Sequence, residues 1–191
     1  METILLLLLL IPYMLIRYLV TDHETKAEKD ARQYQAGIQL VKEKKYGEAI
    51  RYFDHVLTEK PHSALAVAYR GKCNLKLKNL YSCVFDCSRA TSLDETLSEA
   101  YLDKGKALYQ LEEFKSAFLE FDKAVWHARK SPEAFRWRAL GRIRLSHTYE
   151  QVEADLLKAI DLGDEDAAHY LRLVKASRSD NRQDQSMDRQ A

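Results

Sequence analysis

Hydrophobic and polar positions divide the chain of 191 residues into a short apolar beginning and a long amphipathic body. Residues 3–20 hold one charge, Arg17, and one helix breaker, Pro12. At about 1.5 Å of rise per residue, this stretch spans roughly 27 Å, which is close to the thickness of a thin bilayer. We therefore expect residues 1–22 to form a transmembrane helix that anchors the body.

A cleaved secretory signal is the alternative for this segment, because short apolar stretches occur in both. No basic region precedes the stretch, and no small-x-small cleavage site follows it, so an uncleaved anchor is favoured. Basic residues follow the stretch, and such residues are retained in the cytoplasm. They are Arg17, Lys26, Lys29 and Arg32. We expect a single-pass protein whose body faces the cytoplasm, or a periplasmic or secreted body if the segment is cleaved.

A repeated pattern of small and large positions runs through the body. Four of the six glycines, Gly37, Gly71, Gly105 and Gly141, lie 34, 34 and 36 residues apart. Glycine inside a helix costs about 1 kcal/mol relative to alanine, so its recurrence indicates a close approach of two helices. A small or apolar position follows each glycine, and a larger one lies four residues later on the same helix face. These two columns are Ala49, Cys83, Ala117 and Val152, and Phe53, Cys87, Phe121 and Leu156.

The register predicts an all-α fold made of helix pairs, since six glycines and three prolines provide few turns for a many-stranded sheet. The expected helices span residues 23–44, 46–58, 62–77, 80–92, 96–111, 114–128, 133–146, 149–161 and 164–176. Pro61 and Pro132 fall between pairs, where helices must end. The repeats are expected at 30–63, 64–97, 98–133 and 134–163 within a domain of residues 23–176. The last helix would cap the stack, and the polar tail 177–191 is expected to be disordered.

These columns resemble the tetratricopeptide-repeat family, whose unit is also thirty-four residues long. The resemblance covers about residues 30–162, with departures at Val56, at Cys83 and Cys87, and at Val152, where the inner turn is one residue shorter in this register. It implies a right-handed α-solenoid of about four helix pairs whose concave groove binds peptides or partner proteins.

The resemblance places groove residues on the first helix of each repeat. The candidate partner-binding residues are Tyr34, Ile38, Tyr69, Lys72, Lys76, Lys106, Tyr109, Arg138 and Arg142. The ninth position reads Ile38, Lys72, Lys106 and Arg142, a row of positive charge that predicts an acidic or C-terminal peptide as ligand. The alternative is that these cations keep the surface soluble and pair with Glu99 and Asp103.

Relatives that hold the C-terminal carboxylate of heat-shock chaperones use lysine, asparagine and a further basic residue at five groove positions. Those positions hold Tyr34, Ile38, Tyr69, Glu99 and Asp103 here. None matches, and two have the opposite charge. The resemblance therefore predicts that the chaperone carboxylate clamp is absent.

Charge and chemistry favour a binding protein over an enzyme. The 30 basic and 29 acidic residues nearly cancel, so no global field favours nucleic acid. The odd number of cysteines argues against a disulfide framework, and Cys83 and Cys87 fall on packing columns. The histidines show no metal-site spacing, and no catalytic motif is present, so we expect no metal, no cofactor and no catalysis.

Two functions remain open. The first is a membrane-tethered adaptor whose groove recruits a protein or peptide. The second is a structural or assembly subunit whose outer face is buried in a membrane complex. Reversing the charges of Lys72, Lys106 and Arg142 is expected to abolish partner capture by a groove without unfolding the chain.

Overall fold

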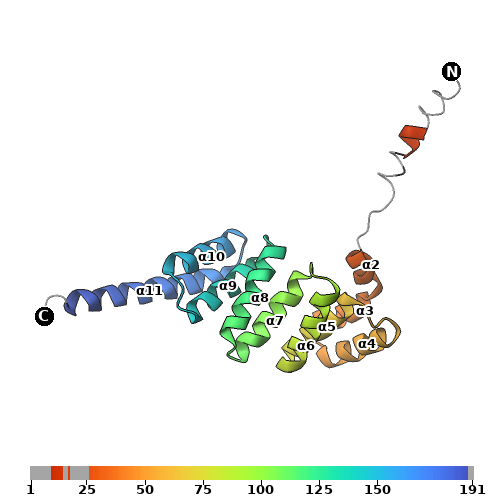
Figure 1. Cartoon of the computed structure of the whole chain (residues 1–191), viewed down its shortest axis with the longest axis horizontal. Helices are drawn as coiled ribbons and strands as arrows, with labels where there is room; N and C mark the ends of the chain where they lie inside the picture. Colours follow the sequence, from red (N-terminus) through yellow and green to blue (C-terminus); the bar gives the residue numbers. More distant parts are fainter. Residues whose placement is uncertain (1–9, 15–16, 18–25, 189–191) are drawn as a thin grey trace, which may run out of the picture. The chain divides into compact units, whose positions relative to one another are not determined.

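The computed structural model describes residues 10–14, 17 and 26–188, and every regular element in these ranges is helical (Figure 1). The chain forms two compact units, Met1–Gln35 and Ala36–Ala191. In the first unit, residues 10–14 are helical and α2 spans Lys26–Gln33. The side chains of Leu10, Ile11, Tyr13 and Met14 are all exposed.

Within the described residues, no helix combines the length and the apolar character needed to cross a bilayer. Most of the predicted anchor, residues 1–22, lies outside the described ranges. The anchor therefore stays a prediction.

The remainder of the described chain folds into successive helices, which confirms the predicted all-α fold. They are α3 (Gln35–Lys42), α4 (Tyr46–Glu59), α5 (Ala64–Lys76), α6 (Leu80–Leu93), α7 (Ser98–Gln110), α8 (Phe114–His127), α9 (Pro132–Arg144), α10 (Tyr149–Asp161) and α11 (Glu165–Asp188). The single helix expected at 23–44 is instead two helices, α2 and α3, which meet at a turn at Tyr34. Helices α5 with α6, α7 with α8, and α9 with α10 pack as consecutive pairs.

The helix ends have local causes in the sequence. The hydroxyls of Ser63 and Ser131 accept backbone hydrogen bonds from Ala66 and Ala134 at the starts of α5 and α9, as expected of N-caps. Pro132 occupies the first turn of α9, where its missing N–H costs nothing. The turns inside the pairs each contain one left-handed residue, and these are Lys44, Lys78, Glu112 and Ser146. Their spacing of 34 residues repeats without variation.

Three of the four glycines lie where the pattern predicts. A Cβ at Gly37, Gly71 or Gly105 would approach side chains of the second helix of the same pair to 2.3, 2.8 or 2.5 Å. The large positions Phe53 and Phe121 are completely buried. These contacts confirm that the glycines allow close packing within pairs.

Gly141 lies in different surroundings. A Cβ there would meet Phe121 and Phe118 of the preceding pair at ordinary contact distances of 3.4 Å or more. Helices α5, α7 and α9 begin at residues 64, 98 and 132, so Ala139, which is fully buried, is the true equivalent of Gly105. The fourth repeat therefore begins two residues earlier than the glycine spacing predicts.

The turn of the fourth pair also differs from the others. Residues 145–148 separate α9 from α10, whereas three residues separate the helices in the earlier pairs. The inner turn is one residue longer than in its neighbours, not one residue shorter as the glycine register indicated.

Helix α11 covers the end of the core. Its residues Ala167 and Leu171 pack in one buried cluster with Ala139, Val152 and Leu156. The helix begins where the cap was predicted but continues to Asp188, beyond the expected end at residue 176. The predicted division into anchor, domain and disordered tail stays a prediction.

Candidate functional site

The first helices of the pairs form a face with a pocket between α5 and α7. Helix α7 contacts both α5 and α9, so side chains from three helices lie side by side. The pocket has a volume of about 180 Å³. It is lined by Leu65, Ala68, Tyr69, Lys72, Thr96, Leu97, Ser98, Glu99, Ala100 and Asp103. We call it the α5–α7 pocket, and the wider face of α5, α7 and α9 is called the groove.

Several predicted groove residues belong to this face. Tyr69 and Lys72 line the α5–α7 pocket. Lys106 lies further along α7 and is mostly buried, and Lys76 is exposed in the last turn of α5. Tyr109 packs edge-on against Trp137 at a ring distance of 5.6 Å. Tyr69, Lys72, Lys106 and Tyr109 therefore lie along the face of first helices, whereas Lys76 is an exposed residue at the end of α5.

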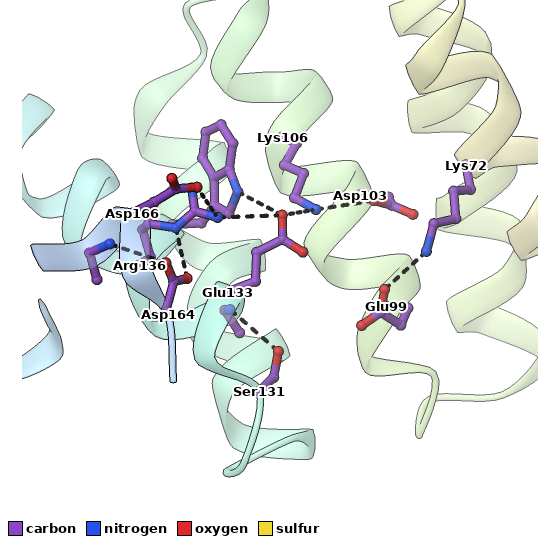
Figure 2. Close-up of polar contacts among 12 residues, drawn as sticks. Lys72, Glu99, Asp103, Lys106, Ser131, Glu133, Arg136, Asp164 and Asp166 are labelled. Carbon is purple, nitrogen blue, oxygen red and sulfur yellow. Dashed lines mark hydrogen bonds and ion pairs between the residues drawn. The ribbon is translucent and has the colours of Figure 1, made fainter. Parts of the chain in front are cut away.

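Acidic partners neutralise the cations of the groove. The ammonium of Lys72 lies 3.3 Å from Glu99, and that of Lys106 lies 2.9 Å from Glu133 and 3.5 Å from Asp103 (Figure 2). These are the pairings that the soluble-surface alternative predicted for Glu99 and Asp103, with Glu133 added. A free row of positive charge is not formed.

The alternation of charge continues towards α11. The guanidinium of Arg136 donates to Asp164 at 2.8 Å and lies 3.4 Å from Asp166 (Figure 2). The indole of Trp137 donates to Glu133 at 3.3 Å. We call this set the charge ladder. It consists of Lys72, Glu99, Asp103, Lys106, Glu133, Arg136 and Asp164.

Two predicted groove residues belong elsewhere, which is a correction. Arg138 donates two hydrogen bonds to Asp155 at 2.9 and 2.6 Å and one to Asp122 at 2.8 Å, which places it against α10 and α8. Arg142 also pairs with Asp155, at 2.8 Å. The ninth residue of α9, equivalent to Lys72 and Lys106, is Leu140. The assignment failed because it was counted from Gly141, which lies two residues after the position equivalent to Gly105.

The two earliest predicted residues are placed as follows. Tyr34 is buried, with 1% of its surface exposed, so its ring is not offered to a ligand. Ile38 is half-buried on α3.

Sequence reasoning missed Glu133, Arg136 and Trp137 as groove residues. The available signal was the Ser131–Pro132 start of a helix, thirty-four residues after Ser98. Counting from that start, instead of from Gly141, assigns these three residues to the groove.

Asp103 is the most unusual group of the pocket. The residue is 2% exposed, and among the described residues Lys106, at 3.5 Å, is the hydrogen-bond donor to its carboxylate. Burial raises the pKa of Asp103, while Lys106 and Lys72 partly oppose that effect. Neither of its oxygens is a fully buried atom without a hydrogen-bond partner, and the donor Lys106 is at the long end of the hydrogen-bond range.

Salt bridges of similar geometry join the first and second helices behind the groove. Arg70 binds Asp86 at 2.6 Å, Lys104 binds Glu120 at 3.2 Å, and Arg138 binds Asp155 at 2.6 Å. Their acidic partners are buried. Because each acidic partner is buried within a pair, these salt bridges join the two helices of that pair.

The second helices expose aromatic side chains on another face. Tyr81, Phe85 and Trp126 are 77%, 67% and 69% exposed. Tyr81 and Phe85 flank a hollow between α4 and α6, and Trp126 flanks one between α8 and α10. We call this the second-helix face.

The three cysteines lie in the core. All are fully buried, and the sulfurs of Cys83 and Cys87 are 3.8 Å apart. Burial raises the pKa of Cys73 to about 11, which disfavours the reactive thiolate. The part of the chain that the structure describes contains no cluster of histidine, cysteine and acidic residues suited to a metal ion.

Comparison with known protein sequences finds relatives that match part of this chain. No family model matches the chain. DnaJ homolog subfamily C member 7 of Mus musculus is 30% identical over 122 residues, which cover 59% of this chain and 24% of that protein. The chain spans between 17% and 32% of the length of the curated relatives it matches.

Solved structures agree over a larger share of the chain. MamA 41-end from Desulfovibrio magneticus RS-1 is similar with a TM-score of 0.67 and 17% identity, over 83% of this chain and 89% of that one. The first TPR of Spaghetti (RPAP3) bound to an HSP90 peptide has a TM-score of 0.57 and 19% identity, over 61% of this chain and 93% of that one. The helix pairs, their spacing and these likenesses define a tetratricopeptide-repeat fold.

Proposed function

We propose that this chain is an adaptor that binds an extended segment of a partner protein in the groove of α5, α7 and α9. The α5–α7 pocket is the main support for this proposal. Its walls include the apolar residues Leu65, Ala68 and Leu97, and its lining also includes charged groups. Concave sites with apolar walls and a few placed polar groups are typical of binding sites. The HSP90 peptide in the Spaghetti structure gives the fold a precedent for peptide binding.

An acidic peptide is not the partner that this geometry favours. That prediction depended on a continuous row of cations, but Lys72 and Lys106 are paired with carboxylates, and Leu140 takes the fourth place. Glu99 and Asp103 would repel a second carboxylate in the pocket. The same repulsion supports the prediction that no chaperone carboxylate clamp is present.

The absent clamp is tested with the pentapeptide Met-Glu-Glu-Val-Asp, which ends the HSP90 peptide of the similar structure. We expect no saturable binding to the full-length chain by fluorescence anisotropy at millimolar protein or below. Micromolar binding that disappears when the C-terminus is amidated would contradict the prediction.

Groove binding is tested with a matched pair of tryptophan variants. Ala68→Trp fills the α5–α7 pocket, whereas Ser82→Trp adds the same side chain at the hollow between α4 and α6. Peptides are selected from a library of N-acetylated, C-amidated octapeptides on the wild-type chain. We expect Ala68→Trp to weaken the selected peptides at least tenfold and Ser82→Trp to leave them unchanged. Equal binding by Ala68→Trp, or no peptide selected at all, would overturn groove binding.

A structural or assembly subunit is the second candidate, and the exposed aromatics of the second-helix face favour it. Exposed aromatic side chains are typical anchors of protein interfaces. In this case Phe85→Ala together with Trp126→Ala would release the partner of a native complex, and Ala68→Trp would retain it. The opposite result in co-purification excludes this candidate.

We propose in addition that residues 1–22 tether the adaptor to a membrane, with the body on the cytoplasmic side. The apolar composition of residues 3–20 and the basic residues after them support this. Alkaline extraction of membranes is expected to retain the full chain and to release residues 23–191. Release of the full chain would contradict tethering, and a mature mass lacking the segment would indicate a cleaved signal.

A further inference from the structure

The α5–α7 pocket combines an apolar wall with a buried negative charge at one point. Leu65, Ala68 and Leu97 provide the wall, and Asp103 lies among the lining residues with 2% of its surface exposed. A ligand group that fits must have an apolar stem and a polar end.

The charges around the pocket select the sign of that polar end. Glu99 and Asp103 line the pocket against one cation, Lys72, and that cation is held by Glu99 at 3.3 Å. Lys106 lies closer to Glu133, at 2.9 Å, than to Asp103, at 3.5 Å. The pocket therefore has an excess of negative charge, and Asp103 has no close donor among the described residues.

We propose that the α5–α7 pocket receives a lysine or arginine side chain of the partner segment. This inference rests on the proposed function of the groove. The methylene stem lies along Leu65, Ala68 and Leu97, and the cationic head donates to the carboxylate of Asp103. The ring of Tyr69 adds a further apolar surface beside the stem.

The 3.5 Å separation of Lys106 and Asp103 leaves the carboxylate able to accept a closer hydrogen bond. The raised pKa of Asp103 reflects its desolvation by burial. A cationic ligand group adds a close, charge-assisted hydrogen bond to this carboxylate. An acidic side chain would be repelled by Asp103, and a neutral side chain would lack the charge that strengthens the hydrogen bond.

The test measures the preference of the full-length chain in the octapeptide library described above. We expect lysine or arginine to be selected at one fixed position. Replacing that arginine by citrulline, its neutral isostere, is expected to weaken binding to the wild-type chain about 10- to 100-fold. Asp103→Asn is expected to weaken the arginine peptide to a similar extent and to abolish most of the difference between arginine and citrulline.

Asp161→Asn is the matched control, because it removes an exposed carboxylate of α10 far along the chain from the pocket. It is expected to bind both peptides like the wild type. Circular dichroism melts show whether both variants fold. If Asp103→Asn does not fold, the comparison of the arginine and citrulline peptides on the wild-type chain still tests the proposal.

The outcomes separate this inference from the proposed function. Peptides that bind and are blocked by Ala68→Trp, but show no preference for a basic residue or no loss with citrulline, overturn the cation pocket and leave groove binding standing. Failure to select any peptide overturns groove binding and the cation pocket with it.

Discussion

Three glycines provide the space that brings the two helices of a pair together. At Gly105 a Cβ would lie 2.5 Å from the ring of Phe121, which is fully buried and cannot easily move. At Gly141 the nearest atom would lie at 3.4 Å, an ordinary contact. Glycines that share a column in the sequence therefore have different energetic roles.

This difference gives a prediction for single alanine substitutions. Gly105→Ala is expected to lower the free energy of unfolding by about 1–3 kcal/mol, because the core is overpacked. Gly141→Ala is expected to leave it unchanged or raise it by up to about 1 kcal/mol, because alanine favours the helix. Urea denaturation of both variants measures the difference, and equal losses would contradict the revised register of the fourth repeat.

The buried carboxylate of Asp103 predicts a pH dependence. It is faced by Lys106 and Glu99 of α7 and by Lys72 of α5, with burial the dominant cause of its raised pKa. Because the folded pKa is raised, Asp103 stabilises the fold most at low pH, and this contribution is lost as pH rises through the folded pKa.

Asp103→Asn should therefore remove the loss of folding stability that accompanies ionisation of Asp103. Relative to the wild type, we expect the variant to be more stable at pH 7, with the advantage disappearing below the unfolded pKa of aspartate. Thermal melts of both proteins from pH 3.5 to pH 7.5 measure this difference in stability. A variant that is less stable than wild type at pH 7 would indicate that Asp103 holds the scaffold together.

At the scale of the element, the salt bridges behind the groove determine which charged residues can be substituted without a loss of stability. Arg142 and Asp155 form a pair at 2.8 Å, and the side chain of Asp155 is only 5% exposed. Lys76 lies in the last turn of α5 and is exposed. Charge reversal at these two basic residues therefore has different consequences.

Arg142→Glu is expected to destabilise the chain by about 3 kcal/mol, because it places a carboxylate beside the buried Asp155. Lys76→Glu is expected to change stability by no more than about 0.5 kcal/mol, as is usual for surface positions. Chemical denaturation compares the two. A fully stable Arg142→Glu variant would support the original assignment of Arg142 to the open groove.

Much of the fold could be predicted from the sequence, because small and large residues recur at the packing positions of each repeat. Ala49, Ala117, Phe53 and Phe121 identified the pairs, and all four are fully buried. The pairing of Lys72 with Glu99 also followed, since both lie on first helices at positions that meet across repeats.

The fourth repeat could not be placed correctly from glycine spacing. One additional residue between α9 and α10 lengthens the turn, and Gly141 happens to lie two residues after the true position, Ala139. Aligning on glycine moved Arg138 and Arg142 into the groove and left out Glu133 and Trp137. A small buried alanine serves the same packing purpose as glycine, so residue identity alone did not reveal the shift.

At the scale of the whole molecule, the end of the core depends on α11. Ala167 and Leu171 cover a cluster that includes Ala139 and Leu156, and Asp164 accepts a hydrogen bond from the Ala167 amide at the helix start. Without this helix, the apolar surface of the last pair would face water. Terminal caps are required in stacked repeats for this reason.

Two truncations test the cap. Removal of residues 165–191 is expected to lower the free energy of unfolding by about 3 kcal/mol, because it exposes Val152, Leu156 and the other core residues that α11 covers. Removal of residues 179–191 keeps the cluster intact and is expected to have little effect. Calorimetry distinguishes them, and equal melting temperatures for the two truncations would show that α11 does not stabilise the core.

The most direct measurement is NMR mapping of a library-selected octapeptide on the isotopically labelled chain. If the peptide binds in the groove of α5, α7 and α9, the largest changes in amide chemical shift are expected at Leu65, Tyr69, Lys72, Glu99 and Asp103. Shifts confined instead to Tyr81, Phe85 and Trp126 would place the ligand on the second-helix face and contradict binding in the groove.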